Sequence, residues 1–135
     1  MSDEQQPQPT SLTEPMAFVE APVNPPRYKH RTDKPVRYFS IVDKESGAVL
    51  GYVWAGDEDD AAAYEYCVSG GARAANEGGF WFSRLRSAKA RGLLPSQALA
   101  ELAADQDTEG KGRPLPGSHA EAPNADVVKA LAKAN

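Results

Sequence analysis

The sequence predicts a small α+β domain in which a β-hairpin, or a three-stranded sheet, packs on a helical pair between disordered termini. Residues 36–42 and 48–54 are two runs of β-branched and aromatic side chains, separated by a short polar loop, as in a hairpin. Apolar side chains at helical spacing follow, and a second helical pattern starts at Pro95. The flanking residues are rich in proline, glycine and charged side chains, a composition typical of chains that lack a packed core.

These composition shifts divide the chain into three parts. Residues 1–35 hold more than half of the 11 prolines and are predicted to be disordered, although residues 16–19 are apolar and could pair with a sheet edge. Residues 36–104 hold both tryptophans and are the predicted compact domain. Residues 105–135 are predicted to be a flexible tail with a short helix over 125–134, for which Asn124 is a suitable cap.

The hairpin carries apolar side chains on both faces. Gly47 suits the left-handed position of its loop. Alternation places Phe39 and Ile41 on one face and Tyr38 and Val42 on the other. Because two strands alone are marginal in water, both faces must be covered, by further elements of the chain or by a partner.

Residues 57–68 are ambiguous between helix and strand. The acidic run 57–60 followed by three alanines favours a short helix with carboxylates at its positive end. The alternation of Tyr64, Tyr66 and Val68 fits a strand as well, so residues 64–69 stay open. A metal-binding role for 57–60 would need further ligands from elsewhere in the chain.

The strongest helical pattern follows the glycine-rich residues 69–71 and ends at Gly92. The next helix begins at Pro95 and buries Ala98, Leu99 and Leu102. The predicted buried stripe of the first helix consists of Ala74, Gly78, Trp81, Leu85 and Ala88.

Charge and cysteine content exclude several classes of protein. The chain has 15 basic and 19 acidic side chains, and each of its three parts is mildly acidic, unlike an ordinary basic nucleic-acid-binding domain. A single cysteine, Cys67, cannot form an internal disulfide. The first residues lack a signal-peptide pattern and no apolar run is long enough to span a membrane, so we expect a cytoplasmic protein without membrane contact.

No assembled catalytic pattern is visible. Cys67 fits a small core residue better than a nucleophile. His30 and His119 lie in segments predicted to be disordered, where a general base is poorly held. Residues 69–73 lack the remainder of a phosphate-binding motif. We therefore expect no catalytic residues, no bound cofactor and no metal, and hence no enzyme.

One surface stands out as a candidate for binding. Aromatic and basic side chains gather on the first helix, and a second basic cluster precedes the hairpin at residues 27–37. The sequence therefore predicts a non-catalytic intracellular binding protein that acts through a protein partner or by self-association, with nucleic-acid binding by the basic helix as the alternative. The candidate interaction residues are Phe80, Phe82, Arg84, Arg86, Lys89 and Arg91.

Overall fold

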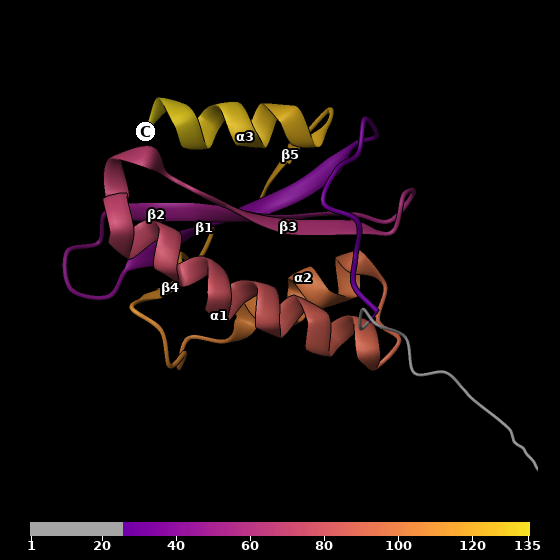
Figure 1. Ribbon diagram of the computed structural model, residues 1–135, viewed down its shortest axis with the longest axis horizontal. Coiled ribbons are helices and arrows are strands. Elements are labelled where there is room, and N and C mark those ends of the chain that lie inside the picture. Colours follow the sequence, from indigo (N-terminus) through magenta and orange to yellow (C-terminus); the bar gives the residue numbers. More distant parts are fainter. Residues whose placement is uncertain (1–25) are drawn as a thin grey trace, which may run out of the picture.

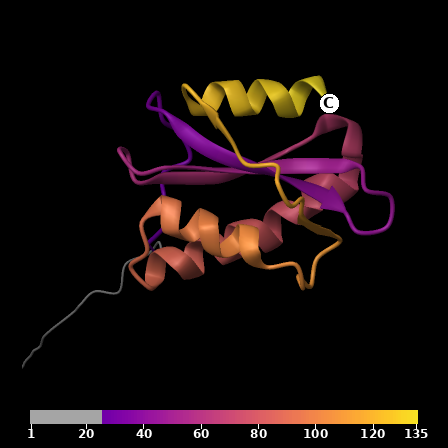
Figure 2. The same cartoon turned by 180° about the vertical axis from the view of Figure 1, so that it is seen from behind.

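The computed structural model describes residues 26–135 and contains a five-stranded antiparallel sheet with helices on both of its faces (Figures 1 and 2). The order across the sheet is β3-β2-β1-β4, and β5 also pairs with β1. The predicted α+β class is confirmed. The predictions for residues 1–25, including the apolar residues 16–19, lie outside the described residues.

The predicted hairpin is formed by β1 (Val36–Asp43) and β2 (Val49–Gly56). Its loop closes through a hydrogen bond from the Asp43 N–H to the Ala48 carbonyl at 2.8 Å. Gly47 has a φ of 77°, the left-handed conformation that the sequence predicts there. The carboxylate of Asp43 accepts hydrogen bonds from the backbone N–H groups of Glu45 and Ser46 in the loop, which explains the ordered turn.

The helix favoured over residues 57–68 is wrong, because this segment contains strand β3 (Ala61–Tyr66), paired antiparallel with β2. Ala62 and Tyr64 pack toward one layer of helices, and Ala61 and Ala63 pack toward the other. A strand buries both sets at once, and this gain outweighs the helix preference of alanine. Asp60 has a φ of 51° in the turn before β3, so it does not begin a helix.

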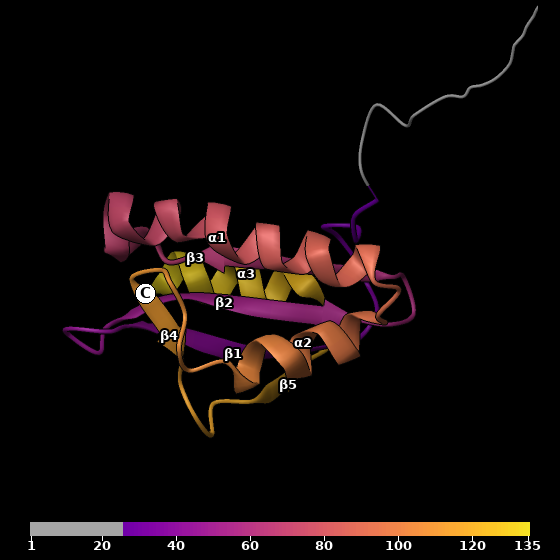
Figure 3. The ribbon, with the colours of Figure 1, turned by 90° about the horizontal axis from the view of Figure 1, so that it is seen from below.

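The predicted helical pair covers one face of the sheet. A short 3₁₀ turn (Val68–Gly70) leads into α1 (Gly71–Ala90), and α2 (Pro95–Ala104) follows after a sharp turn. Both helices lie on the same face of the sheet, below the strands in Figure 1 and in front of them in the view from below (Figure 3). The buried stripe of α1 differs from the prediction at one position, where Glu77 rather than Gly78 is buried. The buried side chains of α1 are Ala74, Glu77, Trp81, Leu85 and Ala88.

The last thirty or so residues belong to the domain and are not the predicted flexible tail. Strand β4 (Gly112–Pro114) pairs with the end of β1, and β5 (Ala120–Ala122) pairs with its beginning. Helix α3 (Ala125–Ala134) spans the residues over which the sequence predicts a helix, and the Asn124 side chain accepts from the Val127 N–H at 3.2 Å. Its apolar side covers the second face of the sheet, so tertiary packing stabilises a helix that would be marginal alone.

Residues 26–35 also belong to the domain, which corrects the prediction that the whole of 1–35 is disordered. Tyr28 is only 2% exposed, and its hydroxyl donates to the Leu93 carbonyl at 2.7 Å. Lys29 forms an isolated bridge beside Ala61 at the start of β3. The compact unit therefore extends well beyond the predicted limits of 36 and 104.

The resulting molecule has three layers and two apolar cores. The larger core lies between the sheet and the α1–α2 pair, and the smaller one lies between the sheet and α3 (Figure 1). Phe39 and Ile41 enter the larger core, while Tyr38 packs against the smaller one, as the alternation of the hairpin predicts. Both sheet faces are thus covered by the chain itself, which leaves the sheet edges as the places where strands can be added.

Candidate interaction surface

The four cations of the predicted basic face do not act together, because three of them are paired with carboxylates from different elements. Arg84 contacts Asp105 at 2.7 Å, at the end of α2. Lys89 pairs with Asp60 in the β2–β3 turn, and Arg91 pairs with Glu101 of α2. Arg86 has no carboxylate within ion-pair distance among residues 26–135. Paired cations have less charge to offer a phosphate backbone, so the predicted basic face is largely neutralised.

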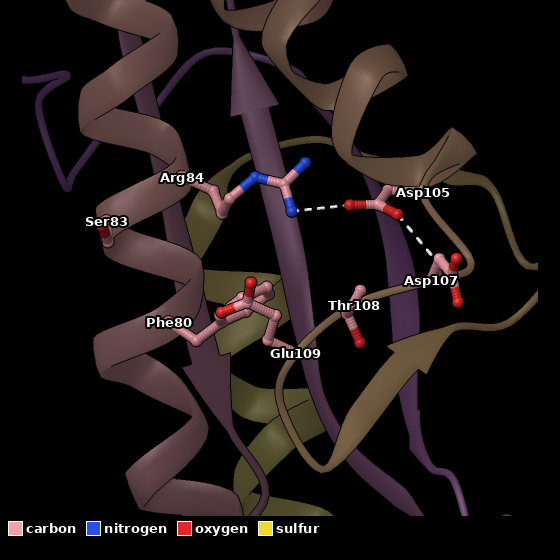
Figure 4. A pocket seen from close by; sticks show the side chains of 7 residues that line it. All are labelled: Phe80, Ser83, Arg84, Asp105, Asp107, Thr108 and Glu109. Atoms are coloured by element: carbon pink, nitrogen blue, oxygen red, sulfur yellow. Dashed lines mark hydrogen bonds and ion pairs between the residues drawn. The ribbon is translucent and has the colours of Figure 1, made fainter.

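Arg84 lies in a shallow pocket between α1 and the loop that follows α2 (Figure 4). Its guanidinium points across the pocket to Asp105 and sits 5.6 Å from the ring centre of Phe80. The hydrogen bond from Arg84, followed by that from the Asp107 N–H, lowers the pKa of Asp105. Since the guanidinium is already engaged and the other charged lining residues are acidic, this pocket does not offer a free cation to a ligand. The lining residues are Phe80, Ser83, Arg84, Asp105, Asp107, Thr108 and Glu109.

The two predicted aromatic contact residues are both half-buried. Phe80 meets Trp81 edge-on, with ring centres 5.0 Å apart. Phe82 packs against both apolar cores and lies against the ring of His30 at 4.9 Å. Phe80 and Phe82 therefore face different sides of α1, the first toward the loop after α2 and the second toward the outer edge of β3.

The acidic run 57–60 serves structural contacts. The Asp57 carboxylate accepts from the N–H and the hydroxyl of Ser96 at 2.8 and 2.6 Å, and so caps the first turn of α2. Asp59 accepts from the Thr32 hydroxyl at 2.6 Å. Within residues 26–135, no three His, Cys, Asp or Glu side chains gather as metal ligands. The sequence predicts that this acidic run caps a helix that follows it directly. In the structure Asp57 caps a helix, but that helix is α2, which begins at Pro95.

Cys67 is fully buried in the smaller core. Burial raises the pKa of its thiol, because the charged thiolate is disfavoured away from water. Both effects oppose nucleophilic chemistry at this position.

We expect the thiol of the folded protein to react with an aromatic disulfide reagent at neutral pH at least about a hundredfold more slowly than in denaturant, because burial withholds the thiolate. The release of the coloured thiolate measures both rates in the same preparation. Cys67→Ser provides the blank. A fast reaction in the folded protein would mean that Cys67 is accessible and would contradict its burial.

Glu77 is a buried carboxylate that the sequence analysis did not single out. It is 4% exposed and accepts the backbone N–H groups of Lys111 and Gly112 at 2.7 and 3.0 Å. The indole N–H of Trp81 donates to the same carboxylate at 3.2 Å. Glu77 therefore holds the loop before β4 against α1. Its three hydrogen bonds offset the cost of removing the carboxylate from water, so the side chain can be buried.

The outer edge of β3 is the open edge of the sheet. Lys29 pairs only with its first residues, where the Ala62 N–H donates to the Lys29 carbonyl at 2.9 Å. Because alternate residues of an antiparallel pair point the same way, the backbone groups of Tyr64 and Tyr66 also point away from β2. Among residues 26–135, no strand pairs with this stretch beyond Lys29. The opposite edge consists of two three-residue strands with Pro114 in one of them, a composition that discourages strand addition.

Exposed apolar side chains lie at the far end of this edge. Tyr66 is 51% exposed and Val68 is 59% exposed. They line a small groove beside α3, together with Ala132 and the side chains of Lys129 and Lys133. A strand added to β3 would therefore contact the apolar side chains of Tyr66 and Val68 next to the backbone groups that it pairs with.

The open edge is surrounded by positive charge. His30 lies beside Phe82 at the edge, and its pKa is lowered first by partial burial and then by the charges of Arg27, Lys129 and Arg86. Among residues 26–135, the carboxylate whose charge opposes these cations at His30 is Glu65, which accepts from the Trp54 indole at 2.9 Å and from Lys129 at 3.1 Å. Cations from the residues before β1, from α1 and from α3 thus lie near β3, although they are far apart in sequence.

Of the predicted contact residues, Phe82 and Arg86 border this edge, whereas Phe80, Arg84 and Arg91 face α2 or the loop after it. Sequence reasoning missed the edge because it favoured a helix for these residues. The alternation of Tyr64, Tyr66 and Val68 is the signal that pointed to it.

The geometry defines a three-layer α+β protein with an open, cation-lined sheet edge. No known protein family, curated protein or solved structure matches the chain. None of the helices in residues 26–135 combines the length and the apolar character that crossing a membrane requires.

Proposed function

We propose that this protein is a non-catalytic binding protein that takes up an extended segment of a partner protein as an added strand on β3. The observation that carries the proposal is the open outer edge of residues 63–66 in a sheet whose two faces are already covered. Backbone groups of an edge strand give affinity to any extended segment, and neighbouring side chains select among segments.

The chemistry of the remaining groups supports binding over catalysis. Two groups near the surface that could take part in chemistry make structural contacts instead: Asp57 caps α2, and Lys89 pairs with Asp60. His119 lies against the ring of Phe39 at 5.6 Å, on the other side of the sheet from Cys67. These groups do not form a nucleophile with an adjacent base.

The predicted nucleic-acid alternative receives less support from the same geometry. Three of the four cations on which it depends contact Asp105, Asp60 and Glu101. A charge-paired surface retains little of the counterion release that drives binding to phosphates.

Amide hydrogen exchange followed by NMR tests the open edge directly. In the free protein we expect the amides of Tyr64 and Tyr66 to exchange at least about tenfold faster than those of Ala63 and Glu65, which face β2. Addition of a binding peptide should slow the first pair and leave the second pair unchanged. Equal protection of all four amides in the free protein would mean that the edge is already closed and would overturn the proposal.

A further inference from the structure

The geometry points to an acidic partner: we propose that the segment bound at β3 is an extended strand of another protein with carboxylates on both sides of its backbone. This inference rests on the proposed function and adds the chemistry of the partner to it. It is carried by the charges that border the edge on both of its faces.

On the α1 side of the edge, the ring of Phe82 lies 4.9 Å from the ring of His30, and Arg86 follows Phe82 by one turn on the same side of α1. Partial burial, and then the charges of Arg27 and Arg86, lower the pKa of His30. On the α3 side, Lys129 and Lys133 line the groove that also contains Tyr66. A strand added to β3 directs successive side chains to opposite faces. Acidic side chains at either set of positions would therefore meet a cation, and basic side chains would be repelled from both.

The local carboxylate does not cancel this charge. Glu65 already accepts from Trp54 and Lys129, so it neutralises only one of the neighbouring cations. Arg86 has no carboxylate partner among residues 26–135, and Lys133 is exposed in the last turn of α3. The edge therefore carries a net positive charge that an acidic segment would complement.

The same charges argue against a second copy of this chain as the occupant. Pairing β3 with β3 of another copy would bring two sets of cations together around one two-fold axis. Like charges opposed across an interface are costly. The cations that would repel a second copy would attract an acidic partner.

The test uses the full chain and two labelled peptides of about eight residues, the length of an ordinary strand. One peptide repeats the order Glu-Glu-Val-Val, which directs glutamates to both faces of the strand, and the other replaces each glutamate with lysine. Fluorescence anisotropy at low salt should show saturable binding of the glutamate peptide and none of the lysine peptide. Added salt should weaken the binding, because the contacts are near the surface and screened.

Charge reversal locates the contact. The double variant Arg86→Glu/Lys133→Glu should weaken binding of the glutamate peptide about tenfold or more, since two attractions become repulsions. Arg37→Glu/Lys111→Glu is the matched control, with the same change of net charge away from β3. We expect the control to retain at least about half of the affinity, because distant surface charges are screened.

The outcomes separate this inference from the proposed function. Absence of binding by either peptide would count against the edge itself. Equal affinities for both peptides, or an affinity for the glutamate peptide that Arg86→Glu/Lys133→Glu leaves unchanged, would support strand addition at the edge and overturn the acidic partner. A dimer in sedimentation that Tyr66→Pro abolishes would identify a second copy as the occupant and would overturn it as well.

One further occupant has the proposed chemistry, namely the chain's own residues 1–25, which carry four acidic and no basic side chains. The variant Glu14→Lys/Glu20→Lys tests it. If the partner is another protein, the affinity of this variant for the glutamate peptide should differ from that of the unmodified chain by less than about twofold, since distant charges are screened. A gain of about tenfold would mean that residues 1–25 compete for the edge, and the partner in trans would be the wrong assignment.

Discussion

Glu77→Gln is expected to lower the free energy of unfolding by about 2 to 3 kcal/mol, because a buried carboxylate that accepts several hydrogen bonds is replaced by a group with one acceptor. The Lys111 and Gly112 N–H groups each donate to a different carboxylate oxygen. An amide places a donor opposite one of these N–H groups, which leaves it unsatisfied in a buried site. Urea unfolding followed by tryptophan fluorescence measures the change.

Glu109→Gln is the matched control, since Glu109 is exposed on the loop that Glu77 holds. We expect it to alter stability by less than about 0.5 kcal/mol, as for surface substitutions in general. Equal effects of Glu77→Gln and Glu109→Gln would show that the bonds of Glu77 contribute little.

The loop that Glu77 holds packs too tightly around the carboxylate to admit a side chain at Gly112. A Cβ added to Gly112 would lie 2.5 Å from the Ile41 Cγ2 and 3.0 Å from the Glu77 Oε1. The backbone of the loop therefore approaches both β1 and the carboxylate more closely than any side chain would allow. Glu77 thus fixes β4 in the sheet, and the loss of its bonds should loosen the edge formed by β4.

Tyr66→Pro is expected to weaken binding of the glutamate–valine peptide by about tenfold or more, because it removes a backbone donor from the open edge and adds bulk there. The Tyr66 N–H points away from β2, so the substitution leaves the pairing of β2 and β3 in place. Titration by fluorescence anisotropy measures the loss.

Tyr66→Ala separates the backbone from the side chain, because it removes the ring and retains the N–H. We expect its effect on affinity to be smaller than that of Tyr66→Pro. If the two variants bind equally, the ring and not strand addition carries the interaction. Thermal unfolding of Tyr66→Pro checks that the fold persists, and the exchange rates of the Tyr64 and Tyr66 amides in the unmodified chain give a second readout.

The protein would then select partners by two separate means. The edge of β3 supplies backbone hydrogen bonds, which accept any extended sequence, and Arg86 and Lys133 bias the choice toward acids. The first contribution disappears with Tyr66→Pro, and the second disappears with salt or with charge reversal.

Local patterns predicted the elements whose neighbours in space are also neighbours in sequence. The hairpin of β1 and β2, the turn at Gly47 and the pair of α1 and α2 follow from alternation, turn chemistry and helical spacing. The same reasoning located α3, because its cap at Asn124 precedes a periodic apolar pattern. It placed the domain limits too narrowly, since Tyr28 and β4 gain their burial from distant residues.

The structure places the six candidate interaction residues in different surroundings. Phe82 and Arg86 lie beside the open edge, but Arg84 and Arg91 contact acids of other elements. A charge pattern on one helix cannot show which cations meet carboxylates across the fold. The alanines of β3 were assigned to a helix because propensity is local, whereas a strand covered on both faces is stabilised by layers that come from other parts of the chain.

The α+β class, the hairpin and the three helices could be predicted from the amino-acid sequence, because periodicity and turn residues act over a few neighbouring positions. The edge position of β3, the burial of Glu77 and the place of Arg86 near the same edge as Lys129 became visible in the folded protein. The reason is physical: burial, ion pairing and strand order depend on contacts between residues that are remote in the chain, and these contacts exist only once the layers are packed.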